Sequence, residues 1–115
     1  MEARAVARWI RMSPLKVRRG ADLVRGKVVD DALNILHFAD IAASEPLEKV
    51  LRSAVANFLN NEEAPKVSPE DLYIKELRVD GAYMLKRFRA GAMGRAMPRR
   101  KRTCHITVVV ADKEN

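Results

Sequence analysis

The sequence predicts an α+β fold: a small body of three helices packed on a short antiparallel sheet, with a long, protruding basic β-hairpin. Three observations support this prediction. Apolar residues recur with a helical period over 47–59, and β-branched residues fill 106–110. A cationic stretch, 81–102, with Gly91 and Gly94 near its middle, lies between two strand-like segments, as in a hairpin.

The length of 115 residues suits a single domain, 1–115, and the hydrophobic fraction of 48% is sufficient for a core. We expect a body formed by 1–80 and 103–115, with an extended hairpin over about 78–105. No apolar run approaches the roughly 20 residues that cross a bilayer, so no membrane partner is expected.

The N-terminal segment 3–12 alternates weakly and predicts a strand with Ala5, Ala7 and Trp9 on one face. Ser13 and Pro14 then predict a helix start, because serine caps helices and proline suits their first position.

This first helix is expected to run to Arg25, followed by Gly26 in a left-handed conformation. Its inner face would carry Val17, Ala21 and Val24.

A second helix is predicted over 29–38, with Asp30 and Asp31 in the first turn, where the helix dipole favours carboxylates. A third helix is predicted to end at Leu59, with Ser44 as its N-cap. Its buried stripe would contain Leu47, Val50, Leu51, Ala54, Val55, Phe58 and Leu59.

Two further strands are predicted over 72–80 and 103–111. In the first, Tyr73, Leu77 and Val79 would share a face. The second is expected to be mostly buried. Between them, one hairpin arm could reach about 50 Å at ~3.3 Å per residue, far beyond a compact body.

The net charge of +7 is strongly partitioned along the chain. Residues 1–27 carry a net charge of +6, residues 28–77 carry −6, and residues 78–105 carry +8. Arginine outnumbers lysine, 14 to 8. Guanidinium groups bind phosphate bidentately and stack on bases, so the pattern favours a nucleic-acid partner, RNA in particular.

From the two basic blocks we expect the RNA contacts to come from Arg11, Lys16, Arg18, Arg19, Arg25, Lys27, Lys86, Arg87, Arg89, Arg95, Arg99, Arg100, Lys101 and Arg102.

No catalytic constellation is found in the sequence. Its two histidines, His37 and His105, are expected to be packed or hydrogen-bonded. Cys104 precedes His105 in a predicted strand, where adjacent side chains point to opposite faces. Burial would disfavour its thiolate, although Arg102 could oppose this. A single cysteine offers no disulfide and no metal cluster, so neither an enzyme nor a metal or cofactor site is expected.

Three stretches resemble the bacterial large-subunit ribosomal protein family called L twenty-two. They are residues 13–18 with 22–27, residues 50–57 with 60–61, and residues 94–96 with 101–109, which reads Lys-Arg-Thr-Cys-His-Ile-Thr-Val-Val. The resemblance is collinear over nearly the whole chain.

The resemblance implies a non-enzymatic structural component of the large ribosomal subunit in the cytoplasm. Such a protein binds large-subunit ribosomal RNA and assists assembly. It lies beside neighbouring large-subunit proteins and lines the exit tunnel, facing the nascent polypeptide near the macrolide site. The tunnel-lining hairpin tip would comprise Ala90, Gly91, Ala92, Met93, Gly94 and Arg95.

Two other functions remain open from the residues alone. One is an architectural DNA-binding protein with a β-ribbon arm. The other is a small enzyme, although paired acid–base groups and a metal set are lacking.

Overall fold

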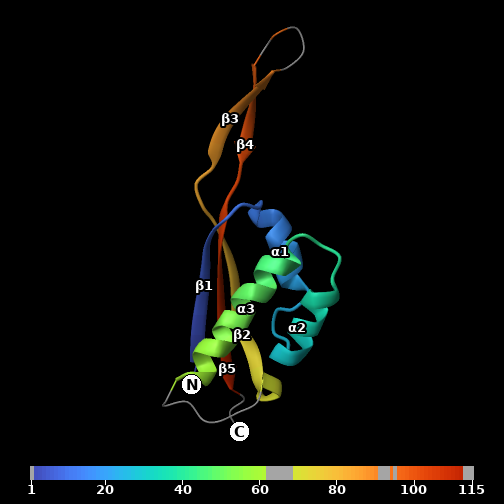
Figure 1. The fold of residues 1–115 in the computed structure, drawn as a ribbon, viewed down its shortest axis with the longest axis vertical. Helices are drawn as coiled ribbons and strands as arrows, with labels where there is room; N and C mark the ends of the chain where they lie inside the picture. The colour runs from blue at the N-terminus through green and yellow to red at the C-terminus, as the bar shows by residue number, and fades with distance from the viewer. Residues whose placement is uncertain (1, 62–68, 91–93, 95, 113–115) are drawn as a thin grey trace.

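The computed structural model describes residues 2–61, 69–90, 94 and 96–112, and for 85–90 and 96–100 the description is of the backbone. Figure 1 shows an elongated molecule in which a two-stranded ribbon projects from the sheet of a body made of helices and strands. Its extents are 65 × 26 × 18 Å, and its radius of gyration is 17.3 Å. A compact chain of this length would have roughly 13 Å, so the ribbon sets the overall shape.

The body contains a three-stranded antiparallel sheet in the order β1–β5–β2. Strand β1 covers Glu2–Ile10, strand β2 covers Leu72–Gly81, and strand β5 covers Cys104–Asp112. The predicted C-terminal strand is therefore confirmed and takes the central position. This position explains why its β-branched residues are buried almost without interruption.

Three helices cover one face of the sheet (Figure 1): α1 over Pro14–Asp22, α2 over Val29–Phe38 and α3 over Ser44–Leu59. A short 3-10 turn, η1, over Pro69–Asp71 precedes β2. The bounds of α2 agree with the prediction, and the α+β class is confirmed.

Helix α1 ends three residues before the predicted Arg25, because a tight turn follows it. The backbone N–H groups of Val24 and Lys27 donate to Ala21 and Val24, three residues back. Gly26 closes this turn with φ of 80°, the left-handed conformation predicted for it.

The third helix begins one residue earlier than predicted, with Ala43 rather than Ser44 at the N-cap. The Ser44 hydroxyl donates to the Ile41 carbonyl at 2.7 Å, so it does not cap the helix. The predicted stripe is buried as far as Phe58, but Leu59 is 48% exposed.

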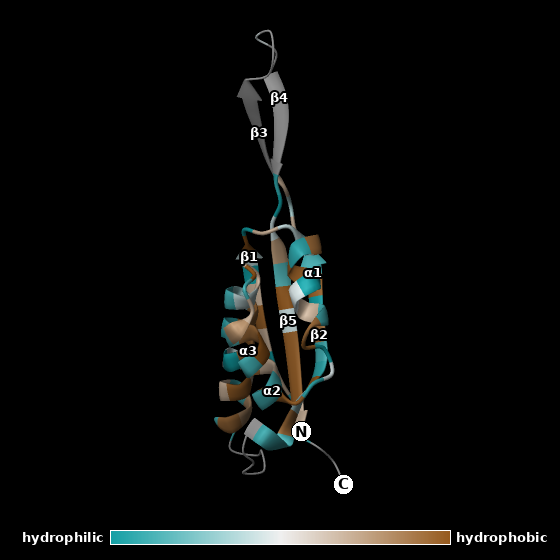
Figure 2. Cartoon of the chain, turned by 90° about the vertical axis from the view of Figure 1, so that its right-hand side faces the viewer, coloured by the Kyte–Doolittle hydropathy of each residue, from teal (hydrophilic) through white to brown (hydrophobic). Residues whose placement is uncertain are grey.

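The core lies between the sheet and the helices, and Figure 2 shows β5 as an apolar band flanked by amphipathic helices. Burying a large apolar side chain contributes about 1.5–3 kcal/mol. The largest fully buried side chains come from every layer: Phe58, Leu36, Leu47, Leu51, Leu72, Ile74, Ile106, Val17, Val24, Val29, Val108 and Val110.

Each edge strand of the sheet contains a register shift that changes which residues face this core. In β2 the shift lies between Ile74 and Glu76, so Leu72 and Ile74 join Leu77 and Val79 in the core. The prediction that Tyr73 shares the face of Leu77 and Val79 is therefore wrong. A bulge adds one residue, which reverses the alternation beyond it.

The ribbon is formed by β3 over Leu85–Ala90 and β4 over Ala96–Lys101, which pair antiparallel. It continues from the end of the body where Gly81 pairs with Cys104. Gly94 has φ of 76°, which favours glycine. The predicted tip residues Gly91, Ala92, Met93 and Arg95 lie outside the described residues.

Candidate nucleic-acid interface

A basic cleft of about 750 Å³ lies where the body meets the ribbon. Five of its lining residues are cationic, and none of the described residues that line it is acidic. Four apolar side chains and Ser13 supply the rest of the wall. The lining residues, here called the basic cleft, are Arg11, Met12, Ser13, Lys16, Arg19, Ile41, Ala42, Ala43, Lys101 and Arg102.

Four chain segments build the basic cleft: the connection after β1, helix α1, the connection between α2 and α3, and the end of β4. Lys16 and Arg19 are three residues apart on α1, a spacing that places side chains on the same helical face. Charges from both predicted basic blocks therefore meet here, although more than 80 residues of sequence separate Arg19 from Arg102.

Gly20 lets α1 lie close to α3 beneath the cleft. A Cβ atom at this position would come within 2.8 Å of Leu47 Cδ1 and 3.3 Å of Ile41 Cδ1. The 2.8 Å distance is shorter than real Cβ contacts allow, so a side chain at position 20 would displace the Leu47 side chain. The absence of a side chain thus helps to place α1 against Ile41 and Leu47.

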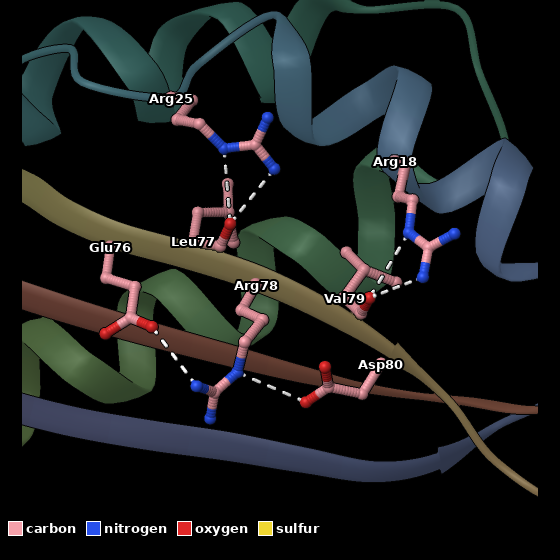
Figure 3. A network of polar contacts seen from close by, with 7 residues as sticks. All are labelled: Arg18, Arg25, Glu76, Leu77, Arg78, Val79 and Asp80. Carbon is pink, nitrogen blue, oxygen red and sulfur yellow. Dashed lines mark hydrogen bonds and ion pairs between the residues drawn. The ribbon is translucent and has the colours of Figure 1, made fainter.

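Two of the predicted RNA-binding arginines bind the protein's own backbone. Arg18 donates from Nε and Nη2 to the Val79 carbonyl at 3.3 and 3.0 Å. Arg25 donates in the same way to the Leu77 carbonyl at 3.2 and 3.0 Å, and it forms an ion pair with Asp22. Figure 3 shows both guanidinium groups reaching from α1 and its following turn to β2.

Lys27 lies outside the basic cleft, beyond the turn that follows α1. Its carbonyl accepts a hydrogen bond from the Ile74 N–H at 3.0 Å, and its side chain is exposed. The cleft therefore unites Arg11, Lys16 and Arg19 but leaves Lys27 at another place on the surface. The sequence did not predict the apolar wall of the cleft. Its residues, such as Ile41, are uncharged, so the pattern of charges does not reveal them.

The open face of the sheet is electrically mixed. Arg78 forms ion pairs with Glu76 at 3.3 Å and Asp80 at 3.2 Å, as Figure 3 shows. Glu2 also pairs with Lys75 near the far end of the sheet. These carboxylates offset the cations around them, so this face suits a polyanion less well than the basic cleft does.

The ribbon places cationic positions opposite one another. In the register, Lys86 pairs with Arg100 and Arg87 pairs with Arg99, whereas Arg89 pairs with Met97. Like charges on directly opposed positions destabilise a ladder. An isolated ribbon of this kind is only marginally stable in water, so a polyanion around it would stabilise it.

The two histidines and the cysteine have structural surroundings. His37 Nδ1 lies 3.5 Å from Glu48 Oε1, and His105 Nδ1 accepts a hydrogen bond from the backbone N–H of Trp9 at 3.2 Å. Burial raises the pKa of the Cys104 thiol, and the charge of Arg18 partly opposes the shift. The opposing cation is thus Arg18 instead of Arg102.

In the described part of the chain, no three His, Cys, Asp or Glu side chains gather where they could hold a metal ion. Within the same residues, no helix combines the length and apolar character needed to cross a membrane.

The chain is similar to known proteins over nearly its whole length. The family model described as ribosomal protein L22p/L17e matches residues 5–111. A protein of Synechococcus sp. (strain JA-2-3B'a(2-13)) is 55% identical over 109 residues, which cover 95% of this chain and 86% of that protein. A Desulfitobacterium hafniense (strain Y51) protein is 52% identical over 113 residues, covering 98% and 96%.

A third relative, from Bifidobacterium animalis subsp. lactis (strain AD011), is 54% identical over 116 residues, covering 99% of this chain and 98% of the relative. All three are named large ribosomal subunit protein uL22. With a family model that spans nearly the whole chain and relatives above 50% identity, this chain belongs to the ribosomal protein L22p/L17e family.

Proposed function

We propose that this protein is a structural component of the large ribosomal subunit that binds large-subunit ribosomal RNA through the basic cleft. In the same proposal, the ribbon lines the tunnel through which the nascent polypeptide leaves. The observation that carries the RNA-binding role is the convergence of five cationic side chains, from segments distant in sequence, on one cleft of about 750 Å³.

The chemistry of the cleft supports a phosphate-bearing ligand. Arg11, Arg19 and Arg102 supply guanidinium groups, which bind phosphate oxygens bidentately. The apolar wall at Met12 and Ile41 suits the sugar and base of a nucleotide better than it suits a free ion. This combination favours a nucleic-acid strand over small anions.

The elongated shape supports the tunnel-lining role. Cationic positions line both strands of the ribbon, and the molecule extends to 65 Å. An isolated ribbon of this kind is only marginally stable, so surrounding RNA would stabilise it, whereas the body has its own apolar core. We place the hairpin tip, Ala90 to Arg95, along the tunnel wall, near the macrolide site, and the body beside neighbouring large-subunit proteins.

The family membership favours a ribosomal role over the DNA-binding arm considered from the sequence alone. The relatives are named as components of the large ribosomal subunit, and such components are structural proteins rather than enzymes. We expect the protein to act in the cytoplasmic ribosome, during assembly and translation, by shape and charge.

The test compares two double variants that remove the same charge. Arg11→Gln with Arg19→Gln removes two cations from the basic cleft, and Arg4→Gln with Arg78→Gln removes two from the open sheet face. Affinity for large-subunit ribosomal RNA is measured by filter binding across salt concentrations. The cleft variant should bind more weakly and lower the log–log salt slope by about 1–2.

The matched control should lose much less affinity, because Arg78 is already engaged by two carboxylates. Equal losses in both double variants would contradict the assignment of the cleft as the RNA contact.

A further inference from the structure

Three aromatic rings from separate elements meet at the base of the ribbon. Trp9 is the second-last residue of β1, Tyr83 lies between β2 and β3, and His105 lies in β5. The Trp9 ring centroid is 5.0 Å from that of Tyr83 and 4.6 Å from that of His105. Trp9 is 54% exposed and Tyr83 is 61% exposed. We call Trp9, Tyr83 and His105 the aromatic cluster.

The backbone at Trp9 adopts a strained conformation that turns the indole outwards. The pairing of β1 with β5 shifts between Ala7 and Ile10, and Trp9 has φ of 60°. A bulky residue rarely adopts this left-handed conformation, and such strain concentrates at functional sites. Ala5 is buried, and Ala7 and Ile10 pack against the core, so the bulge is what exposes the indole.

Strand β5 and the segment before it anchor the backbone at Trp9 and at Tyr83. The backbone N–H of Trp9 donates to His105 Nδ1 at 3.2 Å, so a neutral His105 carries its proton on Nε2. The Thr103 hydroxyl donates to the Tyr83 carbonyl at 2.7 Å, and the Ala82 N–H donates to the Thr103 carbonyl at 3.0 Å. These bonds fix the backbone that carries the two exposed rings, and the rings contact each other with centroids 5.0 Å apart.

The aromatic cluster and the basic cleft are built on the same chain segments. Trp9 precedes Arg11 of the cleft by two residues, a separation of at most about 7 Å along an extended chain. Thr103, which anchors Tyr83, directly follows Arg102 of the cleft. Aromatic rings beside cations are the pattern that binds unpaired nucleobases together with their phosphates.

We infer that Trp9 and Tyr83 form a stacking platform for an unpaired base of the RNA strand whose phosphates occupy the basic cleft. This inference rests on the proposed function and adds to it a base contact. The cations Arg11 and Arg102, which lie close to Trp9 and Thr103 along the chain, favour a nucleic-acid strand over an apolar peptide as the occupant.

The test uses the intrinsic fluorescence of the full-length protein, because Trp9 is its single tryptophan. The probes are an eight-nucleotide oligoadenylate and an abasic ribose-phosphate strand of the same length, titrated at low salt. Oligoadenylate should quench Trp9 fluorescence strongly and bind more tightly, whereas the abasic strand should bind through its phosphates with little quenching.

Variants separate stacking from charge. In filter binding, which does not depend on the tryptophan, Trp9→Ala should weaken oligoadenylate binding at least about 5-fold and leave binding of the abasic strand within about 2-fold. Trp9→Phe should keep most of the affinity. The matched control is Phe38→Ala, which removes an aromatic ring that is 81% exposed on α2, outside the cluster; it should change neither affinity.

Three outcomes would overturn the inference. If the wild-type protein binds both strands equally and the fluorescence is unchanged, the stacking platform is wrong while RNA binding by the cleft stands. If Trp9→Ala impairs ribosome incorporation but not oligoadenylate binding, the occupant is a protein neighbour instead. If the wild-type protein binds neither these strands nor ribosomal RNA, the proposed function fails as well.

Discussion

Arg18 of helix α1 donates two hydrogen bonds to the carbonyl oxygen of Val79 in strand β2, from Nε at 3.3 Å and from Nη2 at 3.0 Å. The contact spans 61 residues of sequence and is partly buried. Since the donor is charged, each bond is stronger than a neutral one. Arg18 therefore fastens the first helix to the sheet, whereas its neighbour Arg19 lines the basic cleft.

This division predicts opposite effects for two adjacent, charge-matched variants. Arg18→Gln should lower the free energy of unfolding by about 1–2 kcal/mol, since it removes charged hydrogen bonds to a partly buried carbonyl. Arg19→Gln should change it by less than about 0.5 kcal/mol but weaken RNA binding. Urea unfolding and filter binding measure the two quantities. Equal stability losses would contradict the distinct roles.

Periodicity was enough to predict the helices, because their buried faces repeat without interruption. The predicted bounds of α2 hold, and the apolar stripe of α3 is buried from Leu47 to Phe58. Strand faces were harder to predict, since each edge strand contains a register shift. One extra residue moved Trp9 out of the face of Ala5 and Ala7, and sequence alternation contains no signal for that bulge.

The candidate site was predictable in charge but not in geometry. The basic blocks include Arg11, Lys16 and Arg19, which line the cleft. Residue type alone did not separate them from Arg18 and Arg25, whose guanidinium groups bind carbonyls of β2. That distinction depends on which side of α1 faces the sheet edge, a tertiary property.

RNA binding by the isolated protein should weaken steeply with salt. Each neutralised phosphate contributes about −0.9 to the log–log slope for duplexes and about −0.7 for single strands. The five cations of the basic cleft should therefore give a slope steeper than about −3. A titration of affinity against salt measures the slope, and a value near zero would refute the electrostatic mechanism.

Cys104 should react slowly with thiol reagents in the folded protein. It is fully buried, and burial raises its pKa above the ordinary value, which disfavours the nucleophilic thiolate. Labelling at neutral pH should be much faster in denaturant than in buffer. Similar rates in both conditions would show that the thiol is accessible in the native state.

The same shift predicts a loss of stability at alkaline pH. A raised pKa in the folded state means that the unfolded chain loses the thiol proton first. The stabilisation is fully present below the unfolded pKa of about 8.5 and declines as the pH rises above it. Cys104→Ser should show a shallower alkaline decline than the wild type in parallel urea titrations. Identical slopes would contradict the prediction.

Docking of the body can be tested separately from the role of the ribbon. Leu51 is 1% exposed in the core, so Leu51→Ala should destabilise the body by about 2–5 kcal/mol through cavity formation and impair ribosome incorporation. Its matched control is Arg52→Ala, since Arg52 is exposed on the same helix and pairs with Glu48. This control should cost less than about 1 kcal/mol.

The ribbon can be shortened without changing its register by deleting Lys86 and Arg87 together with their partners Arg99 and Arg100. Removing two residues from each strand preserves the alternation of faces. The body should stay folded because its core lies outside the ribbon. Ribosome occupancy should therefore persist while macrolide sensitivity or passage of nascent peptides changes. If the deletion abolished occupancy and Leu51→Ala did not, the ribbon rather than the body would dock the protein.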